Sequence, residues 1–338
     1  MRTIFFTLSV VFSFFNQLAL AEDNTSSKQT LTVYTYNSFT SDWGPGPKVK
    51  KAFEEDCNCK LKFVALEDGV SLLSRLKLEG KNTKADVVLG LDTNLTAEAQ
   101  ATGLFAPHDL SIKNSSLPNP WNNKTFLPYD FGYFAFVYDK TKLKNPPKSL
   151  KDLVENKDAP KILIQDPRTS TPGLGLLLWV KQVYGDKANE AWEKLSPRIV
   201  TVSKGWSEAY GLFLKDEAPM VLSYTTSPAY HIISEKKENY AAAKFVEGHY
   251  QQIEVAGLVK SSKQPKLAKK FLSFMLSEKF QSLIPTTNWM YPASLAEDKL
   301  PKAFKTLVDP SPALIFDEAE VAKNRKAWVK EWLNALAK

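Results

Sequence analysis

Residues 162–184 read Ile-Leu-Ile-Gln-Asp-Pro-Arg-Thr-Ser-Thr-Pro-Gly-Leu-Gly-Leu-Leu-Leu-Trp-Val-Lys-Gln-Val-Tyr, and this stretch indicates the fold class. It begins with a short apolar run, residues 162–165, that is typical of a buried strand. Ser170 and Pro172 follow at positions suited to a helix cap and to the first helical turn. The next residues have helical periodicity as far as Gly185, which is suited to a helix C-terminus. The stretch therefore predicts a strand, a turn and a helix in direct succession.

The same alternation of strand and helix recurs along the chain of 338 residues. Further strand-like runs are expected at residues 31–36, 61–66, 86–90, 133–139, 220–224 and 253–259. Further helices are expected at residues 49–56, 70–78, 207–214, 229–237, 266–276 and 317–336. This pattern predicts an α/β fold. The length corresponds to about two domains, at roughly 100–200 residues per domain.

Four of the expected helices follow turns that are rich in glycine, proline and polar cap residues. These turns are residues 43–47, 68–69, 170–173 and 226–228. Ligands bind at the carboxyl ends of the strands in an open α/β sheet, and helix N-termini are suited to anions. A single hydroxyl residue would be explained as a cap that stabilises its helix by about 1 kcal/mol. Because hydroxyl residues occur in runs, at 169–171 and 225–227, we expect a binding cleft there.

Aromatic residues lie close to the same turns. They are Tyr36, Trp43, Trp206, Tyr224, Tyr230, Trp289 and Tyr291. Trp43 is in a Gly/Pro loop and Trp289 follows the segment 285–288, and neither has the periodicity of a packed face. Together with the hydroxyl runs, these rings predict a pocket for a flat ring that carries an anionic group.

The first 21 residues predict a secretory signal peptide. Arg2 is their only charge, an apolar run covers residues 4–15, and small residues occupy positions 19 and 21. That run is shorter than the ~20 residues of a membrane-spanning helix, and no later segment reaches this length. We therefore expect a signal peptide at residues 1–21, a polar disordered leader at residues 22–29, and export of the mature protein.

The chain carries 44 Lys and Arg residues against 37 Asp and Glu residues, a formal charge of +7. The basic residues are mixed along the sequence and form no basic stripe, so a nucleic-acid partner is not expected. The sequence contains no nucleophile elbow, no zinc-protease motif and no phosphate loop, so we do not expect an enzyme.

The two cysteines, Cys57 and Cys59, are one residue apart. They could form a disulfide or a reactive thiol pair, and the oxidising compartment of an exported protein favours the disulfide. The histidines His108, His231 and His249 show no ligand spacing relative to the cysteines or to one another. A metal site is therefore not expected.

Several strings of the sequence closely resemble the thiamine-binding periplasmic proteins of bacterial thiamine ABC transporters. These strings are residues 31–36, 42–47, 65–71, 165–175, 204–211, 223–231 and 288–292. The resemblance covers roughly residues 31–292. Two departures are visible: the segment from Ala293 onward matches less clearly, and Tyr129 and Phe131 stand where the family pattern has the two aromatics exchanged.

The resemblance implies a type II periplasmic binding fold, with two α/β lobes joined by a hinge. The implied N-terminal lobe is residues 30–128 plus about 255–315, the central lobe is 129–254, and residues 316–338 form a helix that packs on the lobes. The implied ligands are thiamine, thiamine monophosphate and thiamine diphosphate, delivered to an inner-membrane permease with an ATPase subunit. The protein is expected to be a monomer without a cofactor.

Carried over residue by residue, the implied ligand-binding positions are Asp68, Gly69, Ser170, Thr171, Trp206, Tyr224, Thr225, Thr226 and Ser227. We add the nearby aromatics Tyr36, Trp43, Tyr230 and Trp289. The aromatic rings would flank the ligand rings and attract the cationic thiazolium. Asp68 would offset that cation or accept from the exocyclic amine. The hydroxyls and amides of Ser170, Thr171, Thr226 and Ser227 would hold the phosphate.

Two alternatives from other classes stay open on the sequence. A thiaminase-like enzyme of the same fold would need Cys57 or Cys59 in the cleft as a thiolate nucleophile. A ferric-ion binding protein of the same fold class would use closely placed tyrosines, such as Tyr224 and Tyr230, with His231.

Overall fold

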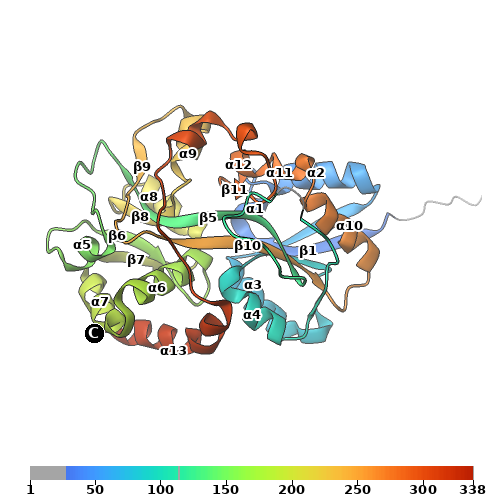
Figure 1. The fold of residues 1–338 in the computed structure, drawn as a ribbon, viewed down its shortest axis with the longest axis horizontal. Helices are drawn as coiled ribbons and strands as arrows, with labels where there is room; N and C mark the ends of the chain where they lie inside the picture. Colours follow the sequence, from blue (N-terminus) through green and yellow to red (C-terminus); the bar gives the residue numbers. More distant parts are fainter. Residues whose placement is uncertain (1–27, 113–114, 338) are drawn as a thin grey trace, which may run out of the picture.

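The computed structural model describes residues 28–112 and 115–337. The predicted signal peptide and most of the predicted leader lie outside these residues. The strands form one continuous sheet in the order β2-β1-β3-β10-β5-β8-β6-β7. Figure 1 shows two groups of helices and strands, one on each side of the central strands β5 and β10.

The first group is built on the parallel strands β1 (Thr30–Tyr36), β2 (Lys60–Leu66) and β3 (Val87–Asp92). Its helices are α1 (Asn37–Thr40), α2 (Gly46–Cys57), α3 (Gly69–Glu79), α4 (Thr93–Ala101), α10 (Pro265–Met275), α11 (Glu278–Gln281) and α12 (Ile284–Thr287). In Figure 1, α2 lies on one side of these strands, and α3 and α4 lie on the other. β3 is buried along its whole length, because helices cover both faces of a parallel sheet.

The second group is built on β6 (Ile162–Gln165), which pairs in parallel with both β7 (Ile199–Ser203) and β8 (Met220–Tyr224). Its helices are α5 (Leu150–Glu155), α6 (Thr171–Tyr184), α7 (Ala188–Leu195), α8 (Trp206–Leu214) and α9 (Pro228–Tyr230). The stretch that opened the sequence analysis is β6 followed by α6. Ser170 caps α6 as predicted, and Trp179 on this helix is fully buried.

Two long strands run between the groups, β5 (Phe126–Asp139) and β10 (His249–Val259). β10 pairs with β3 and with β5, and β5 continues the sheet by pairing with β8. The sequence predicted residues 133–139 of β5 and 253–259 of β10. The first half of β5 was missed because Pro128, Asp130 and Gly132 are residue types that strands disfavour. A register shift opposite Pro128 accommodates the proline. The predicted lobe boundaries, 128/129 and 254/255, fall inside these two strands.

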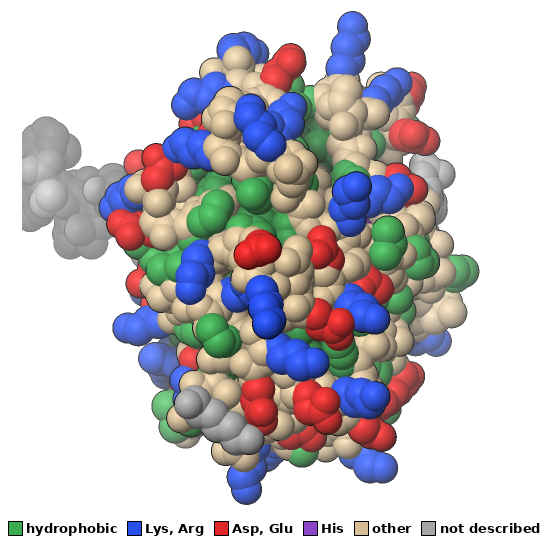
Figure 2. Space-filling model, turned by 90° about the vertical axis from the view of Figure 1, so that its left-hand side faces the viewer, with side chains coloured by type: hydrophobic (Ala, Val, Ile, Leu, Met, Phe, Trp, Pro, Cys, Tyr) green, Lys and Arg blue, Asp and Glu red, His purple; other side chains and the backbone are tan. Residues whose placement is uncertain are grey.

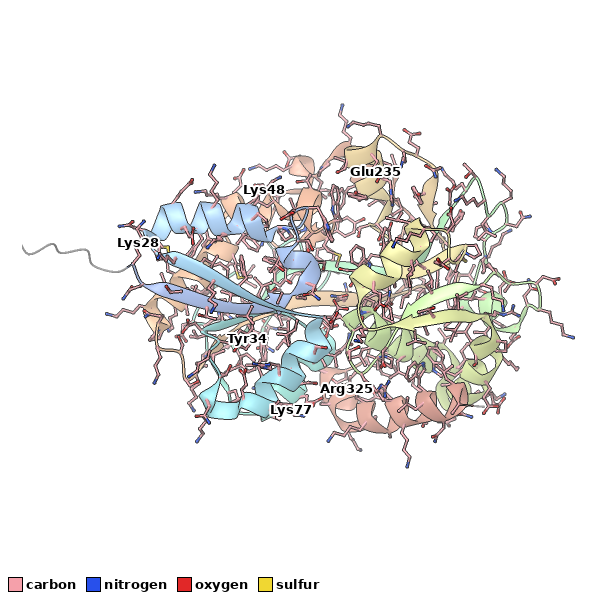
Figure 3. The ribbon with its side chains drawn as sticks, turned by 180° about the vertical axis from the view of Figure 1, so that it is seen from behind. Lys28, Tyr34, Lys48, Lys77, Glu235 and Arg325 are labelled. Carbon is pink, nitrogen blue, oxygen red and sulfur yellow. A yellow bond between two sulfur atoms is a disulfide. The ribbon has the colours of Figure 1, made fainter. Side chains whose placement is uncertain are left out.

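The last helix, α13 (Glu318–Leu336), packs against α4 in the first group and against α6 and α7 in the second. Figure 1 shows α13 passing along both groups. Arg325 on α13 forms an ion pair with Glu98 of α4, and Lys77 of α3 reaches the other oxygen of Glu98. In Figure 3, Arg325 and Lys77 lie next to each other on this side of the molecule. The helix therefore ties the two halves together on the side away from α9 and α12.

Short elements complete the described chain. The short strands are β4 (Phe105–Ala106), β9 (Tyr240–Ala242), β11 (Tyr291–Pro292) and β12 (Ala313–Leu314). The remaining helical turns are η1 (Gly80–Asn82), η2 (Gly185–Lys187), η3 (Ser196–Arg198), η4 (His231–Glu235), η5 (Glu297–Lys299) and η6 (Lys302–Thr306). The helix expected at residues 229–237 is thus α9 followed by the π-helical turn η4.

The surface carries side chains of both charge signs, and the two cysteines are bonded to each other. On the face in Figure 2, Lys and Arg side chains are interspersed with Asp and Glu side chains and form no basic stripe. Cys57 and Cys59 are joined by a disulfide at the end of α2. Within residues 28–112 and 115–337, no helix has the length and apolarity needed to cross a membrane.

Candidate functional site

A cavity of about 240 Å³ lies between the two groups of elements. It is lined by Tyr36, Ser38, Trp43, Asp68, Thr171, Pro172, Trp206, Ser207, Tyr210, Gly211, Leu214, Tyr224, Ser227, Tyr230, Glu254, Asn288, Trp289 and Met290. These residues come from the ends of β1 and β8, from the first turn of α6, from the whole length of α8, and from β10 and the segment after α12. The cavity is therefore at the carboxyl ends of strands, as expected for an α/β sheet.

The N-termini of three helices meet beside the cavity. Asp68, Ser170 and Gly205 are the N-cap residues of α3, α6 and α8. One carboxylate oxygen of Asp68 accepts hydrogen bonds from the Ser170 hydroxyl at 2.6 Å and from the Trp206 backbone N–H at 3.1 Å. Asp68 therefore links all three helix N-termini, and it does so across the two halves of the protein.

A second set of contacts crosses between the halves next to Asp68. The Gly69 N–H donates to the Thr171 hydroxyl at 3.1 Å, and both the N–H and the hydroxyl of Ser71 donate to the Thr169 carbonyl. A side chain on residue 69 would lie 2.7 Å from the Thr171 hydroxyl oxygen and closer still to the Gly90 carbonyl. Glycine is therefore required here so that the two halves can approach.

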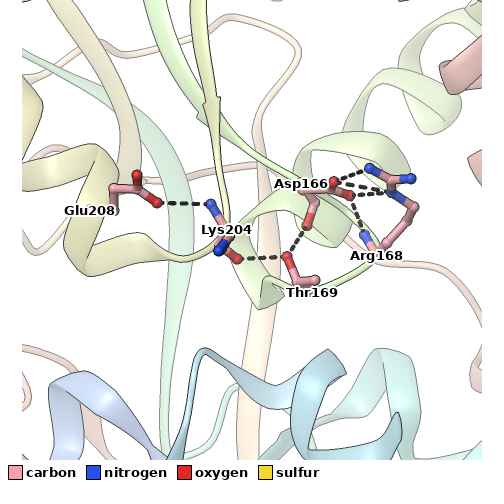
Figure 4. Close-up of polar contacts among 5 residues, drawn as sticks. All are labelled: Asp166, Arg168, Thr169, Lys204 and Glu208. Carbon is pink, nitrogen blue, oxygen red and sulfur yellow. Dashed lines mark hydrogen bonds and ion pairs between the residues drawn. The ribbon is translucent and has the colours of Figure 1, made fainter.

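The loops after β6 and β7 are fixed to each other at the rim of the site (Figure 4). The Thr169 hydroxyl donates to the Lys204 carbonyl at 2.6 Å, and the Lys204 N–H donates to the Glu208 carboxylate at 3.1 Å. Arg168 forms an ion pair with Asp166 in the first of these loops. These contacts hold the first turns of α6 and α8 in place before any ligand arrives.

Aromatic rings form the walls of the cavity. The Trp206 ring is stacked on Tyr210 with centroids 4.9 Å apart, and the Trp206 indole N–H donates to the Ser223 hydroxyl at 2.7 Å. Trp43 lies 6.0 Å from Trp206 across the cleft and is 47% exposed, so it stands at the mouth. Trp289 packs edge-on against Tyr230 at 5.3 Å. Flat rings on several sides suit a flat ligand.

Behind Tyr210, a buried histidine fixes the orientation of this wall. His231 shares a hydrogen bond of 2.8 Å with the Tyr210 hydroxyl through one ring nitrogen, and a contact of 2.8 Å with Glu235 through the other. Tyr240 is stacked on the imidazole at 3.7 Å. Burial lowers the pKa of His231, although Glu235 acts in the opposite direction. His231 is thus occupied by protein partners and does not reach the cavity.

The polar groups at the cavity are acidic rather than basic. Asp68 and Glu254 line it, and the lining contains no Lys, Arg or His. Burial raises the pKa of Asp68 to about 7, although the Ser170 and Trp206 hydrogen bonds act against this shift. Glu254 accepts hydrogen bonds from the hydroxyls of Tyr36 at 2.9 Å and Tyr129 at 2.8 Å. A positively charged ligand would meet complementary charge here.

Most of the residues proposed from the sequence line the cavity. They are Tyr36, Trp43, Asp68, Thr171, Trp206, Tyr224, Ser227, Tyr230 and Trp289. Gly69, Ser170, Thr225 and Thr226 lie behind this lining. The Ser227 hydroxyl bonds to Ser223 at 2.7 Å, and that of Thr226 contacts the Met290 sulfur at 3.9 Å. The hydroxyls proposed to hold phosphate, those of Ser170, Thr171, Thr226 and Ser227, therefore already have protein partners. The hydroxyl of Thr225, a proposed ligand-binding residue without a phosphate role, is buried without a partner among the described residues.

Sequence reasoning missed several lining residues, of which Glu254, Asn288 and Tyr210 are the most informative. Glu254 is a single charged residue in the apolar run 253–259, and that exception could have been noticed. Asn288 and Tyr210 stood inside strings already quoted for the resemblance. Their contributions depend on partners far away in the sequence, such as Tyr36 for Asn288.

The geometry favours neither alternative from other classes. Cys57 and Cys59 are bonded to each other and are not among the cavity residues, so neither is a free thiolate in the cleft. His231, named for the ferric-ion alternative, is held by Tyr210 and Glu235, and the Tyr224 hydroxyl donates to Gln252.

Two α/β halves that close around a lined cavity define a solute-binding protein. The profile of the family described as "Bacterial extracellular solute-binding protein" matches residues 46–282. The chain belongs to this family and, within it, to the thiamine-binding periplasmic proteins, as its relatives show.

Curated relatives named "Thiamine-binding periplasmic protein" match nearly the whole chain. The protein of Escherichia coli (strain K12) is 64% identical over 312 residues, which cover 92% of this chain and 95% of that relative. The protein of Brucella abortus biovar 1 (strain 9-941) is 57% identical and covers 97% and 98%. The protein of Haemophilus influenzae (strain Rd) is 47% identical and covers 96% of each.

The solved structures agree with this family. A structure described as "Periplasmic thiamin binding protein" is 63% identical, has a TM-score of 0.90, and covers 92% of this chain and 97% of that chain. The apo ferric-ion-binding protein A of Pasteurella haemolytica has a TM-score of 0.72 at 19% identity, covering 91% and 98%. At that identity the likeness shows the shared fold alone. The type II periplasmic binding fold expected from the sequence is confirmed.

Proposed function

We propose that this protein binds thiamine in the cavity between its two halves and delivers it to an ABC transporter. The observation that carries the proposal is the lining: aromatic walls and buried carboxyls without a basic side chain. Thiamine consists of two flat rings, of which one, the thiazolium, is cationic. The names of the relatives at 47–64% identity support the same ligand.

The aromatic walls explain how flat rings would be held. The stacked pair of Trp206 and Tyr210 offers one face, and Tyr230 with Trp289 offers another. A cation over such a face gains about 0.5–2 kcal/mol, more when water is excluded. Thiamine is therefore cargo that is recognised by shape and charge, and it is not a cofactor of a reaction.

Thiamine monophosphate and diphosphate are proposed as further ligands, with the phosphate at the junction of α3, α6 and α8. Three helix N-termini favour an anion at this point. In the structure the carboxylate of Asp68 occupies the junction and accepts the hydrogen bonds of Ser170 and Trp206. A phosphate would have to displace Asp68, so phosphorylated forms compete with a contact of the protein itself.

The proposed role in transport follows from the closed arrangement. Contacts at Asp68, Gly69 and Ser71 join the two halves beside the cavity, and β5 and β10 are the connections about which the halves would open. A ligand shifts an open–closed equilibrium only by binding the closed state better. The protein would act as a monomer in the periplasm, without catalysis, and hand its ligand to a permease powered by an ATPase subunit.

Calorimetry tests the proposal directly. The protein purified from periplasm is titrated with thiamine, thiamine monophosphate and thiamine diphosphate, with 4-amino-5-hydroxymethyl-2-methylpyrimidine as a ligand that lacks the cationic ring. Saturable one-to-one binding of thiamine, much weaker binding of the pyrimidine, and no pyrimidine released on long incubation are expected. Absence of thiamine binding would reject the proposed function, and release of pyrimidine would reinstate a thiamine-cleaving enzyme.

A further inference from the structure

Three buried carboxyl groups form a row across the sheet beneath the cavity. Glu254 on β10 is the register partner of Asp92 on β3 and of Asp130 on β5. Asp92 and Asp130 are fully buried, and Glu254 is 6% exposed because it lines the cavity. Register partners in a sheet share a face, so the three side chains lie side by side.

The buried oxygen Asp130 Oδ1 of this row could accept a further hydrogen bond. Glu254 Oε2 accepts from the hydroxyls of Tyr36 and Tyr129. The Asn288 side-chain amide donates to Asp130 Oδ2 at 2.6 Å and reaches Glu254 Oε2 at 3.3 Å. Asp130 Oδ1 has no partner in the part of the chain that the structure describes, although it is buried. A proton shared by the two carboxyl groups would supply the missing donor.

Among the described residues, no Lys, Arg or His side chain forms an ion pair or a hydrogen bond with Asp92, Asp130 or Glu254. The titratable groups that face the row are Asp68 at the N-terminus of α3, the phenols Tyr36, Tyr129, Tyr224 and Tyr250, and Glu318 at the start of α13, which acts on Asp92. Burial raises the pKa of Asp92, Asp130 and Glu254, and the charge of Glu254 raises the pKa of the other two further. At Glu254 itself, the hydrogen bonds with Tyr129, Asp130 and Tyr36 act against the rise. Two neighbouring carboxyls in such surroundings share one proton, because both cannot ionise together.

We propose that the Asp130–Glu254 pair is the counter-charge for the cationic ring of the ligand, and that capture of this ligand releases a proton from the pair. The inference rests on the proposed function, which supplies the cation. In the free protein the pair holds one proton and one negative charge. When the cation enters, the second carboxyl ionises and its proton leaves to solvent. No covalent bond forms or breaks in the ligand.

This arrangement selects for charge and not only for shape. A neutral ligand of the same outline would fill the aromatic walls equally well, but it would leave the pair protonated. A cationic ligand is attracted by the second negative charge of the pair. This contribution to the binding free energy becomes larger as the pH rises, because the proton is then removed from the pair more easily. The affinity for a cationic ligand is therefore expected to rise as the pH rises, while that for a neutral isostere stays constant.

The test compares thiamine with its neutral isostere deazathiamine, in which an uncharged thiophene replaces the thiazolium. Calorimetry near pH 7 in two buffers of different ionisation enthalpy counts the protons exchanged. Proton release is expected with thiamine and not with deazathiamine. Thiamine binding without proton release, at an affinity equal to that of deazathiamine, would overturn the inference and leave the proposed function intact. Failure to bind either ligand would reject the proposed function itself.

Variants then assign the effect to the pair. Glu254→Gln and Asp130→Asn are expected to weaken thiamine at least about tenfold, the equivalent of one pKa unit, and to abolish proton release. Deazathiamine binding reports whether each variant keeps its cavity, so a folding defect is recognised by loss of both ligands. Glu297→Gln removes an exposed carboxylate as a matched control and should change nothing. Retention of proton release and thiamine affinity in Glu254→Gln or Asp130→Asn would overturn the inference.

Discussion

The Asp68 carboxylate lies 2.6 Å from the Ser170 hydroxyl, and this hydrogen bond joins the N-terminal caps of α3 and α6. The two residues are 102 positions apart in the chain and belong to different halves of the protein. The same carboxylate oxygen accepts from the Trp206 N–H, so this side chain joins the two halves next to the contacts of Gly69 and Ser71. In this structure the Asp68 carboxylate therefore both joins the two halves and fills the position at the helix N-termini that favours an anion.

Replacing Asp68 should change the preference between phosphorylated and free ligands. Asp68→Asn removes a negative charge from the point where three helix N-termini favour an anion. We expect the affinity for thiamine diphosphate to rise at least about tenfold relative to that for thiamine, because the phosphate no longer competes with a carboxylate. Parallel calorimetric titrations measure this ratio. Asp42→Asn, an exposed residue near the mouth, is the control, and an unchanged ratio in Asp68→Asn would place the phosphate elsewhere.

Ser170 should matter for stability as well as for the phosphate. Its hydroxyl donates to Asp68 and accepts from the Gly173 N–H as the cap of α6. Ser170→Ala should lower the free energy of unfolding by about 1–2 kcal/mol in urea denaturation, because a cap is lost and a buried carboxylate loses a donor. Ser71→Ala, which removes a neighbouring contact between the halves, is the comparison. Equal losses of affinity for thiamine and its diphosphate in Ser170→Ala would contradict the proposed phosphate role.

Trp206 should be needed for closure around the ligand. Its ring is stacked on Tyr210, its indole N–H is bonded to Ser223, and its backbone N–H is bonded to Asp68. Trp206→Ala removes the flat face against which a ligand ring would lie. We expect this variant to scatter X-rays as an open form at thiamine concentrations that close the parent. Trp206→Phe keeps a ring and should stay closed, and compact scattering by Trp206→Ala would show that other residues bridge the cleft.

Asp92 should make the ligand-free protein less stable as the pH rises. Burial raises its folded-state pKa to about 7, above the value of about 3.9 in an unfolded chain. The stability contributed by the neutral carboxyl is therefore complete below about pH 4 and is lost as the pH passes through 7. Asp92→Asn cannot ionise, so it should exceed the parent in free energy of unfolding by about 1–3 kcal/mol near pH 8 and match it near pH 4.

The same experiment has a built-in check. Asp309 is an exposed carboxylate whose pKa is lowered by the Ser311 N–H, so Asp309→Asn should not gain stability at high pH. Asp68, Asp130 and Glu254 titrate in both Asp92→Asn and the parent, so only the difference between the two proteins reports on Asp92. A constant difference from pH 4 to pH 8 would mean that Asp92 stays ionised throughout.

The turns that carry the site could be predicted from the sequence because their signals are local. Ser170 and Pro172 mark a helix start whatever the rest of the chain does, and the cap at Ser170 is found as expected. The partner of Ser170 could not be predicted, because Asp68 reaches it only after the two halves close. Glu254 and Asp130 meet through the register of two strands, and that register depends on the irregularity opposite Pro128. Such contacts depend on tertiary structure and leave no local pattern.

The Arg325 side chain should stabilise the packing of α13 across the two halves without changing the affinity for the ligand. Its guanidinium donates to Glu98 through two nitrogens, and both side chains are largely buried between α13 and α4. Lys77 holds the other oxygen of Glu98, so the pKa of Glu98 is lowered and its charge is kept when Arg325 is removed. Arg325→Met should therefore lower the free energy of unfolding by about 1–3 kcal/mol at neutral pH.

The loss caused by Arg325→Met should shrink as the pH falls and Glu98 takes up a proton, because a lowered pKa contributes stability only above the unfolded value. Arg75→Met is the matched control: it breaks an exposed pair with Glu79 within one helix, and such pairs contribute about 0.5 kcal/mol or less. Denaturation of both variants at neutral and acidic pH measures the difference, and thiamine affinity should be the same in both, because neither residue lines the cavity. Equal stability losses in the two variants would show that the Arg325–Glu98 contact adds no more than a surface pair, so that α13 is held to α4 by its apolar face alone.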